Sequence, residues 1–262
     1  IALKCAKYHD KPFFSRFGYM LSEFEQNENR EYQKFIDLEN QVFEDADKII
    51  VTTKSIKTKV EKRIKKRLNK IVIVPNYVDT NLFKPQNNLI KKYDILFIGR
   101  IVEQKNLISL LKALDTINVN ALIIGDGYLR DELISQFIHL KERLTWKKCI
   151  PNNELPTIMN QSKLFILPSH YEGHPKILLE AMSCGMAVIG AKSPGIVELI
   201  KDRINGYLSE TDFVSIRLAI NKLLSKSDLR QSLGYSARES ALNNFSLEKI
   251  VKLEYDLYSS IV

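Results

Sequence analysis

The fold is decided by the stretch LFILPSHYEGHPKILLEAMSCGMAVIG at positions 164–190. Its first residues, 164–167, form a short apolar run that is typical of a buried strand. A polar loop follows, and a helix is predicted at 177–183, after the break at Pro175. A second apolar run at 187–190 predicts another strand. This order of strand, loop, helix and strand is the unit from which parallel sheets are built.

The same alternation continues on both sides of this stretch. Further strands are predicted at 49–52, 71–74, 95–98, 121–124 and 206–208, and further helices at 55–68, 107–114, 129–140, 214–225, 229–243 and 247–260. Apolar strands that alternate with helices imply a parallel sheet that is covered on both faces, and the right-handed crossover rule makes it doubly wound. Ligands bind such sheets beyond the carboxyl ends of the strands. The segments that follow the strands, at 100, 125–127, 169–176 and 191–195, are therefore the places to search for a site.

Composition excludes several classes of protein. The chain has 262 residues, of which 45% are hydrophobic and 27% are charged, as in ordinary globular domains. No apolar run approaches the length of a membrane-spanning helix. The three cysteines form no CxxC pair and the four histidines form no HExxH motif, so the sequence predicts no bound metal.

The net charge of +8 comes from one segment. Residues 54–70 (KSIKTKVEKRIKKRLNK) hold nine basic residues and one acidic residue, and the rest of the chain holds 30 of each. Apolar residues recur in the segment every four positions, which indicates an amphipathic helix. Either this helix packs on a sheet with a solvated basic face, or it attracts anionic lipid headgroups or an anionic acceptor. No aromatic residues lie between the charges to stack on bases, so nucleic acid is not a predicted partner.

Two carboxylates flank the start of the predicted helix at 177–183. Glu172 lies in the loop before the helix and Glu180 lies about one turn inside it. The free N–H groups and the dipole of a helix N-terminus bind anions such as phosphate. Each carboxylate can accept hydrogen bonds from sugar hydroxyls on one side of that phosphate. The arrangement suits a nucleotide-diphosphate sugar.

A basic pair follows the predicted strand at 95–98. Arg100 comes directly after this strand and Lys105 precedes the next helix, so both can point into the same crevice. Arginine makes forked contacts with phosphate oxygens, and lysine supplies a point charge.

Residues 76–245 resemble the nucleotide-sugar-binding domain of the family-4 retaining glycosyltransferases (glycosyl transferases group 1), which have the two-domain GT-B fold. The matching segments are PNYVDTNLF at 75–83, ILFIGRIVEQKNL at 95–107, LIIGDGYLRDEL at 122–133, the stretch at 164–190 and GIVELIKDRINGYL at 195–208. The spacing from Glu172 to Glu180 is that family's signature.

The resemblance implies a role for each site residue. Arg100 and Lys105 would bind the donor diphosphate and neutralise the leaving group. Glu172 would contact the donor hexose, and Glu180 the ribose. The catalytic group would be Glu172 with Arg100 and Lys105. The remaining donor-binding residues, which would hold phosphate and sugar through their backbone or border the base, would be Gly173, His174, Pro175, Lys176, Ile177 and Ile150.

The resemblance also predicts the domain organisation. It implies a complete C-terminal Rossmann-like domain at 76–245 and the latter part of an acceptor-side Rossmann-like domain at 1–75. Residues 246–262 would form a helix that returns to the acceptor-side domain. The opening strands of that domain are expected to be missing, so the chain is expected to be N-terminally incomplete. Arg16 and Tyr19 stand near the place where many relatives carry a cleft histidine, and we assign them to the acceptor side.

The sequence therefore predicts a retaining, hexosyltransferase-like enzyme of cell-surface polysaccharide synthesis. It would move a sugar from a nucleotide-diphosphate sugar to a glycan or a lipid-linked acceptor, with no cofactor and no metal. A cytoplasmic location is expected, at the inner face of the cell membrane if residues 54–70 meet lipid. One alternative is a module that binds nucleotide-sugar without transferring it. Another is an adaptor that works at the membrane surface through residues 54–70.

Overall fold

The computed structural model describes residues 2–18, 30–64, 68–87 and 89–260. The chain divides into two compact units. The first comprises Ile1–Asn76 and Ile250–Val262, and the second comprises Tyr77–Lys249. The expected division at 75 and 245 lies within a few residues of these limits.

The first unit is built on a small parallel sheet. Its elements are α1 (Ala2–Tyr8), β1 (Phe14–Phe17), α2 (Arg30–Asp45), β2 (Lys48–Val51), α3 (Lys54–Arg63), a 3₁₀ turn (Leu68–Lys70), β3 (Ile71–Ile73) and most of α10 (Leu247–Ser259). The strands are parallel in the order β1-β2-β3. Alternate residues of β2 point to opposite faces, as the period of a strand requires.

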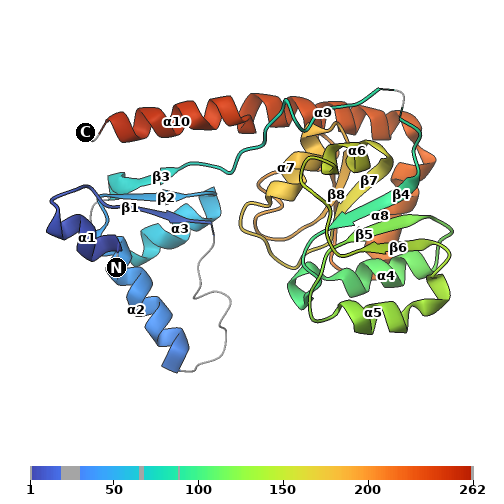
Figure 1. The fold of residues 1–262 in the computed structure, drawn as a ribbon, viewed down its shortest axis with the longest axis horizontal. Helices are drawn as coiled ribbons and strands as arrows, with labels where there is room; N and C mark the ends of the chain where they lie inside the picture. The colour runs from blue at the N-terminus through green and yellow to red at the C-terminus, as the bar shows by residue number, and fades with distance from the viewer. Residues whose placement is uncertain (1, 19–29, 65–67, 88, 261–262) are drawn as a thin grey trace. The chain divides into compact units, whose positions relative to one another are not determined.

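Helices cover both faces of this sheet (Figure 1). Ile49 and Val51 of β2 pack with apolar residues of α3 and the end of α2. Ile50 lies on the opposite face and packs with Ile250 and, at the margin, Leu257 of α10. The last helix therefore completes the core of the first unit, although it is separated from the sheet by the whole second unit in sequence.

The basic helix is shorter than predicted. It begins after Thr53, whose hydroxyl caps the N–H of Ile56, and it ends at Arg63 because Ile64 takes an extended conformation (φ −99°, ψ 119°). The expected continuation to residue 68 was wrong at this point, since the buried side chain of Ile64 joins the core from a non-helical backbone. Residues 65–67 lie outside the described residues.

Two of the basic residues at 54–70, Arg63 and Lys70, stabilise the fold of the first unit. The Arg63 guanidinium bonds Glu39 at 2.5 Å and lies over the ring of Phe43. The buried Lys70 ammonium donates to the carbonyl oxygens of Glu44 and Ala46. Both cations therefore hold α2 against the 54–70 segment, and the solvated basic face is smaller than the sequence alone indicates.

The second unit carries the larger sheet. Its strands are β4 (Tyr93–Ile98), β5 (Ala121–Ile124), β6 (Leu144–Lys147), β7 (Ser162–Leu167), β8 (Ala187–Ala191) and β9 (Tyr207–Ser209). Its helices are α4 (Leu107–Asp115), α5 (Arg130–Gln136), α6 (Leu155–Asn160), α7 (Lys176–Ser183), α8 (Phe213–Ser225) and α9 (Ser227–Phe245). The predicted helix at 129–140 is interrupted at Phe137, whose backbone (φ −107°, ψ 28°) leaves the helical region, and a 3₁₀ turn follows at Ile138–Leu140.

All six strands are parallel, in the order β6-β5-β4-β7-β8-β9. Relative to its start at β4, the chain first winds outward through β5 and β6. It then returns to the other side of β4 and winds outward through β7, β8 and β9. This is the doubly wound order, and its switch point lies between β4 and β7. The predicted α/β class with a doubly wound sheet is confirmed.

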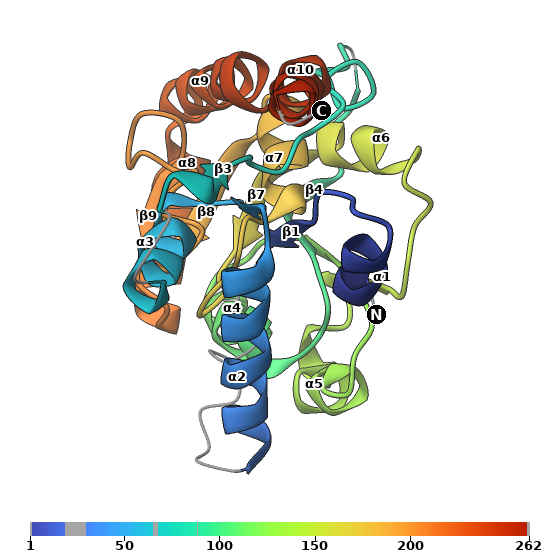
Figure 2. The same cartoon turned by 90° about the vertical axis from the view of Figure 1, so that its left-hand side faces the viewer.

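Two apolar cores sandwich this sheet. Ile95 and Phe97 of β4 point into the core formed with α4, α5 and α8, whereas Leu96 points into the core formed with α6, α7 and α9. Figures 1 and 2 show α4 and α5 on one side of the sheet and α6 and α7 on the other. Each face is fully covered, so the polar loops at the strand ends are where the sheet is open to a ligand.

Glycines allow α7 and α9 to pack closely. Gly234, inside α9, lies against Gly185, which ends α7 with a positive φ of 71°. A Cβ added at Gly234 would stand 2.3 Å from the carbonyl oxygen of Gly185. Since that oxygen belongs to the backbone, the helix itself would have to move.

We therefore expect Gly234→Ala to destabilise the protein by about 1–3 kcal/mol, the usual cost of overpacking. In an exposed helix the same change would stabilise by up to about 1 kcal/mol. Chemical denaturation measures the difference. Ser232→Ala on the exposed side of α9 is the control and should stay within about 0.5 kcal/mol of the wild type. A stabilised Gly234→Ala variant would show that the two helices are not held at this contact.

Candidate functional site

The predicted site residues gather at the switch point of the larger sheet. Arg100 and Lys105 follow β4, and the loop at 168–175 follows β7, which is the direct neighbour of β4. The chain leaves these two strands toward opposite sides, and in doubly wound sheets this is the place where ligands bind. The structure thus brings together Arg100, Lys105 and Glu172, as the sequence predicts.

Lys105 and Glu172 form a buried ion pair. The Lys105 Nζ lies 2.5 Å from the Glu172 Oε1, and the two side chains are only 12% and 8% exposed. Arg100, in contrast, is exposed. The hydrogen bond found for its side chain among the described residues is a long one, 3.5 Å, to the Oε1 of Gln104. One of the two predicted phosphate ligands is therefore paired within the protein, and the other is open to a ligand.

Asn106 fixes the loop after β4. Its backbone takes the left-handed conformation (φ 50°, ψ 37°), which asparagine tolerates better than most residues. Its buried side-chain amide donates to the carbonyl oxygens of Pro168, at 3.1 Å, and Thr211, at 2.8 Å. Asn106 thereby ties the loops that follow β4, β7 and β9. This role of Asn106 was not predicted from sequence, although an asparagine directly before an apolar helix was a signal for it.

Further hydrogen bonds fix the backbone of the loop after β7. The N–H of His170 donates to the Gln104 carbonyl at 2.9 Å, and the Gln104 side chain donates to the Tyr171 carbonyl at 2.8 Å. The N–H of Glu172 donates to the Pro194 carbonyl at 2.9 Å. The carboxylate of Glu172 consequently projects from a backbone that is held on both sides. Gln104 and Pro194 were not singled out by sequence.

Gly195 permits the contact with the loop at 191–195. Its φ is +81°, a conformation that favours glycine, and a Cβ there would stand 2.2 Å from the Glu172 carbonyl oxygen. The segment after β8 can therefore lie directly on the peptide of Glu172.

The N-terminus of α7 is left without a side-chain cap. Pro175 is the N-cap residue (φ −68°, ψ 108°), one position earlier than the first-turn place expected from sequence. No side chain bonds the first turn, and the first turn contains no acidic residue. The amide groups at the start of this helix are thus available to an anion, and the helix dipole favours one.

Glu180 lies inside α7 and is buried, with 6% of its surface exposed. Among the residues that the structure describes, no hydrogen bond to its carboxyl group is found. Burial raises the pKa of this carboxyl to about 7, and the nearby Lys176 ammonium opposes the rise. The fold therefore holds a carboxyl group that changes its charge near neutral pH.

The other predicted donor-binding residues lie at or beside α7. His174 is buried, with its ring 5.5 Å from that of Phe245. The Lys176 ammonium lies 4.6 Å from the centre of the Tyr77 ring. Gly173 and Ile177 are half-buried.

Ile150, the predicted neighbour of the base, follows β6 and packs at the margin of the core shared with α6 and α7.

Arg16, assigned by sequence to the acceptor side, belongs to the first unit. Its guanidinium pairs with Glu254 of α10 and makes a long contact, 3.4 Å, with the Pro75 carbonyl. Arg16 therefore joins β1 to α10 within that unit. Tyr19 lies outside the described residues.

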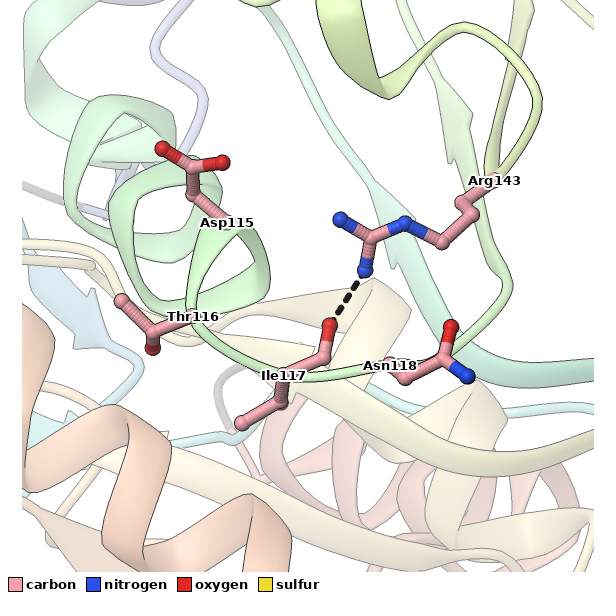
Figure 3. A pocket seen from close by; sticks show the side chains of 5 residues that line it. All are labelled: Asp115, Thr116, Ile117, Asn118 and Arg143. Atoms are coloured by element: carbon pink, nitrogen blue, oxygen red, sulfur yellow. Dashed lines mark hydrogen bonds between the residues drawn. The ribbon is translucent and has the colours of Figure 1, made fainter.

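A surface hollow of about 400 Å³ lies away from these residues (Figure 3). It is lined by Asp115, Thr116, Ile117, Asn118 and Arg143. These residues precede β5 and β6, so the hollow lies at the amino ends of the strands, opposite the switch point. The Arg143 guanidinium donates to the carbonyls of Leu114 and Ile117, and this closes the turn after α4.

Two kinds of feature are absent from the described ranges, a metal-ion site and a membrane-spanning helix. No group of three or more His, Cys, Asp or Glu side chains in these ranges is arranged to hold a metal ion. Within the same ranges, no helix combines the length and the apolar character needed to cross a bilayer.

Known proteins are similar to this chain in sequence and in fold. The family described as Glycosyl transferases group 1 matches residues 78–240. A curated relative from Escherichia coli, UDP-Gal:alpha-D-GlcNAc-diphosphoundecaprenol alpha-1,3-galactosyltransferase, is 31% identical over 219 residues, which cover 74% of this chain and 55% of that protein. The chain thus spans little more than half the length of this relative.

Solved structures share the fold. Sucrose-phosphate synthase from Thermosynechococcus elongatus superposes with a TM-score of 0.89 at 21% identity, over 98% of this chain and 70% of that one. Anabaena HepE, solved in complex with UDP, superposes with a TM-score of 0.86 at 20% identity, over 98% of this chain and 75% of that one. These likenesses confirm the GT-B type of fold.

The raised pKa of Glu180 predicts how stability depends on pH. A carboxyl whose pKa rises from its ordinary 4.5 to about 7 on folding binds its proton more tightly in the folded state. Stability is then lost as the pH rises from about 4.5 to about 7, by on the order of 3 kcal/mol. Denaturation of the wild type and Glu180→Gln across this range should show the wild type losing stability relative to the variant. Parallel curves of stability against pH for the two proteins would contradict the raised pKa of Glu180. The variant Glu132→Gln, at an exposed position, is the control for general effects of removing a charge.

Proposed function

The chain belongs to the Glycosyl transferases group 1 family, and we propose that it forms the donor-binding part of a retaining glycosyltransferase that uses a nucleotide-diphosphate sugar. The observation that carries the proposal is the meeting of two cations, Arg100 and Lys105, with the uncapped N-terminus of α7 at the switch point of the sheet. Arg100 and the α7 N-terminus supply positive potential for a departing diphosphate, and Lys105 adds to it when Glu172 turns to the sugar.

Each group has a chemical task in this proposal. Arg100, Lys105 and the first amides of α7 bind the diphosphate and stabilise the negative charge that develops as the sugar–phosphate bond breaks. Glu172 accepts hydrogen bonds from hexose hydroxyls and lies beside the positive charge that the sugar gains. Because this charge is greatest in the transition state, the contribution of Glu172 falls mainly on the chemical step.

The remaining donor residues bind parts of the nucleotide that do not react. Glu180, one turn inside α7, accepts hydrogen bonds from the ribose hydroxyls. The backbone around His174 and Ile177 holds phosphate and sugar, and Ile150 borders the base. No metal and no cofactor takes part in the proposed reaction.

The acceptor in this proposal is a glycan or a lipid-linked saccharide, as in cell-surface polysaccharide synthesis. The printed name of the Escherichia coli relative specifies a diphosphoundecaprenol-linked acceptor for that protein. An acceptor of this kind would place the protein at the cytoplasmic face of the membrane. The exposed basic residues of α3, Lys54 and Lys62, are the described residues that would meet an anionic lipid surface there.

A second candidate function is binding of nucleotide-sugar without transfer. The residues that the site brings together, Arg100, Lys105 and Glu172, are all assigned to the donor, and this favours a chain that binds the donor whether or not it transfers the sugar. Assay of sugar transfer alongside donor binding separates the two functions.

We expect Arg100→Ala and Lys105→Ala each to weaken binding of the preferred nucleoside diphosphate by about 1.5–3 kcal/mol, as for hydrogen bonds to charged groups. Saturation-transfer NMR against a panel of nucleotide-sugars identifies the ligand, and calorimetry measures the affinity. Lys112→Ala, on the exposed side of α4, removes the same charge away from the site and should have no effect. Unchanged affinity in folded Arg100→Ala and Lys105→Ala variants would overturn the proposed donor site.

For the membrane surface, we expect binding to vesicles that contain anionic lipid and a decrease in that binding as salt is added, because ions screen exposed charges. The double variant Lys54→Gln and Lys62→Gln should bind more weakly than the wild type in co-sedimentation. Equal binding to neutral and anionic vesicles would contradict this part of the proposal.

A further inference from the structure

The ion pair between Lys105 and Glu172 has a consequence for the choice of ligand. The lysine that should take up a phosphate is already neutralised by a carboxylate at 2.5 Å, and both side chains are close to nine-tenths buried. Charges at this depth interact strongly, because little water is present to screen them. Any diphosphate that binds Lys105 must therefore compete with Glu172.

Glu172 cannot move far away when this happens. Its N–H is bonded to the Pro194 carbonyl, and the preceding residue, Tyr171, is bonded through its carbonyl to Gln104. Gly195 lies directly on the peptide that follows Glu172. The carboxylate can leave Lys105 by rotation of its side chain, but its backbone stays in place beside the incoming anion.

A displaced Glu172 needs new hydrogen-bond donors. A buried carboxylate without a partner is costly, and an adjacent anion raises that cost. The hydroxyl groups of a donor sugar can donate to it, so a nucleotide-sugar compensates for the broken ion pair. A nucleoside diphosphate without a sugar brings its charge to Lys105 and offers Glu172 no donor.

We infer that Glu172 is a specificity-determining residue that disfavours the sugar-free nucleoside diphosphate and thereby promotes release of this product after transfer. The inference rests on the proposed function, because it concerns the same donor site. It adds a role in discrimination between donor and product to the contact between Glu172 and the sugar.

The test compares two ligands in five proteins. Calorimetry is carried out on the wild type with UDP and UDP-glucose, with GDP and GDP-glucose, and with ADP and ADP-glucose, and the base that binds best is used thereafter. In the Glu172→Gln variant, Lys105 no longer pairs with a carboxylate. We expect the nucleoside diphosphate to bind about tenfold more tightly, the size of effect that removal of a close like charge can produce. The nucleotide-sugar should gain less, because it loses its contact with the carboxylate.

Three further variants, Glu103→Gln, Lys105→Met and the double variant of Lys105→Met with Glu172→Gln, show whether the effect acts through the ion pair. Glu103→Gln removes an exposed carboxylate from the 3₁₀ turn that contains Lys105, and it should leave both affinities unchanged. In the background of Lys105→Met, the change Glu172→Gln should give no gain in affinity for the nucleoside diphosphate. Melting temperatures confirm that each variant is folded.

The outcomes are distinct. An unchanged or weaker affinity of folded Glu172→Gln for the nucleoside diphosphate overturns the inference, as does an equal gain in Glu103→Gln or a gain that persists with Lys105→Met. If neither the wild type nor Glu172→Gln binds any of the six ligands, the proposed function itself fails. Binding by the wild type without tighter binding by the variant leaves the proposed function standing and removes only the inference.

Discussion

The pairing of β4 with β7 is the constraint on which the site depends. These neighbouring parallel strands end at the same edge of the sheet, and the chain leaves them in opposite directions. Loops that diverge in this way cannot cover the strand ends, so the edge stays open. Every group to which we assign work on the donor phosphates follows β4 or β7. Their proximity results from strand order, since Arg100 and Glu172 are far apart in sequence.

The sheet edge can position functional side chains only if the loops around it are fixed. Asn106 ties three of them through two hydrogen bonds to backbone carbonyls, and Gln104 and Pro194 hold the backbone on either side of Glu172. These bonds satisfy groups that would be costly to bury unpaired. Because they involve mainly backbone atoms of the loop, they fix it without engaging the carboxylate of Glu172, which pairs with Lys105. The apolar cores beneath, one on each face of the sheet, provide the rigid base for this arrangement.

Much of the fold and the position of the site were predictable from sequence. The physical reasons for this also limit what could be predicted. Runs such as Ala121–Ile124 are apolar at every position because the strand is buried on both faces, and this pattern predicts a covered parallel sheet. The site residues follow strands directly, so the general rule for parallel sheets located them.

The pairing of Lys105 with Glu172, the ties from Asn106 and the contact of Gly234 with Gly185 were not predictable. They depend on three-dimensional distances between segments that a local pattern does not encode. The end of α3 at Ile64 has the same origin, since tertiary packing of this side chain prevails over the helical period.

The two signature carboxylates, Glu172 and Glu180, have opposite surroundings in the fold, and this difference bears on the ligand that we propose. Glu172 pairs with the Lys105 ammonium and projects from a fixed backbone, so it stays in place until a ligand replaces Lys105 as its partner. Glu180 is buried without a hydrogen bond among the described residues, and burial raises its pKa to about 7. Hydrogen-bond donors brought by a ligand would give this carboxyl group partners that it lacks among the described residues. A molecule that satisfies both must offer hydroxyl groups at two positions, separated by an anion that the α7 N-terminus and Arg100 can bind. Under the proposed function, a hexose and a ribose joined by a diphosphate meet these requirements, whereas a simple phosphate or a free sugar meets only part of them.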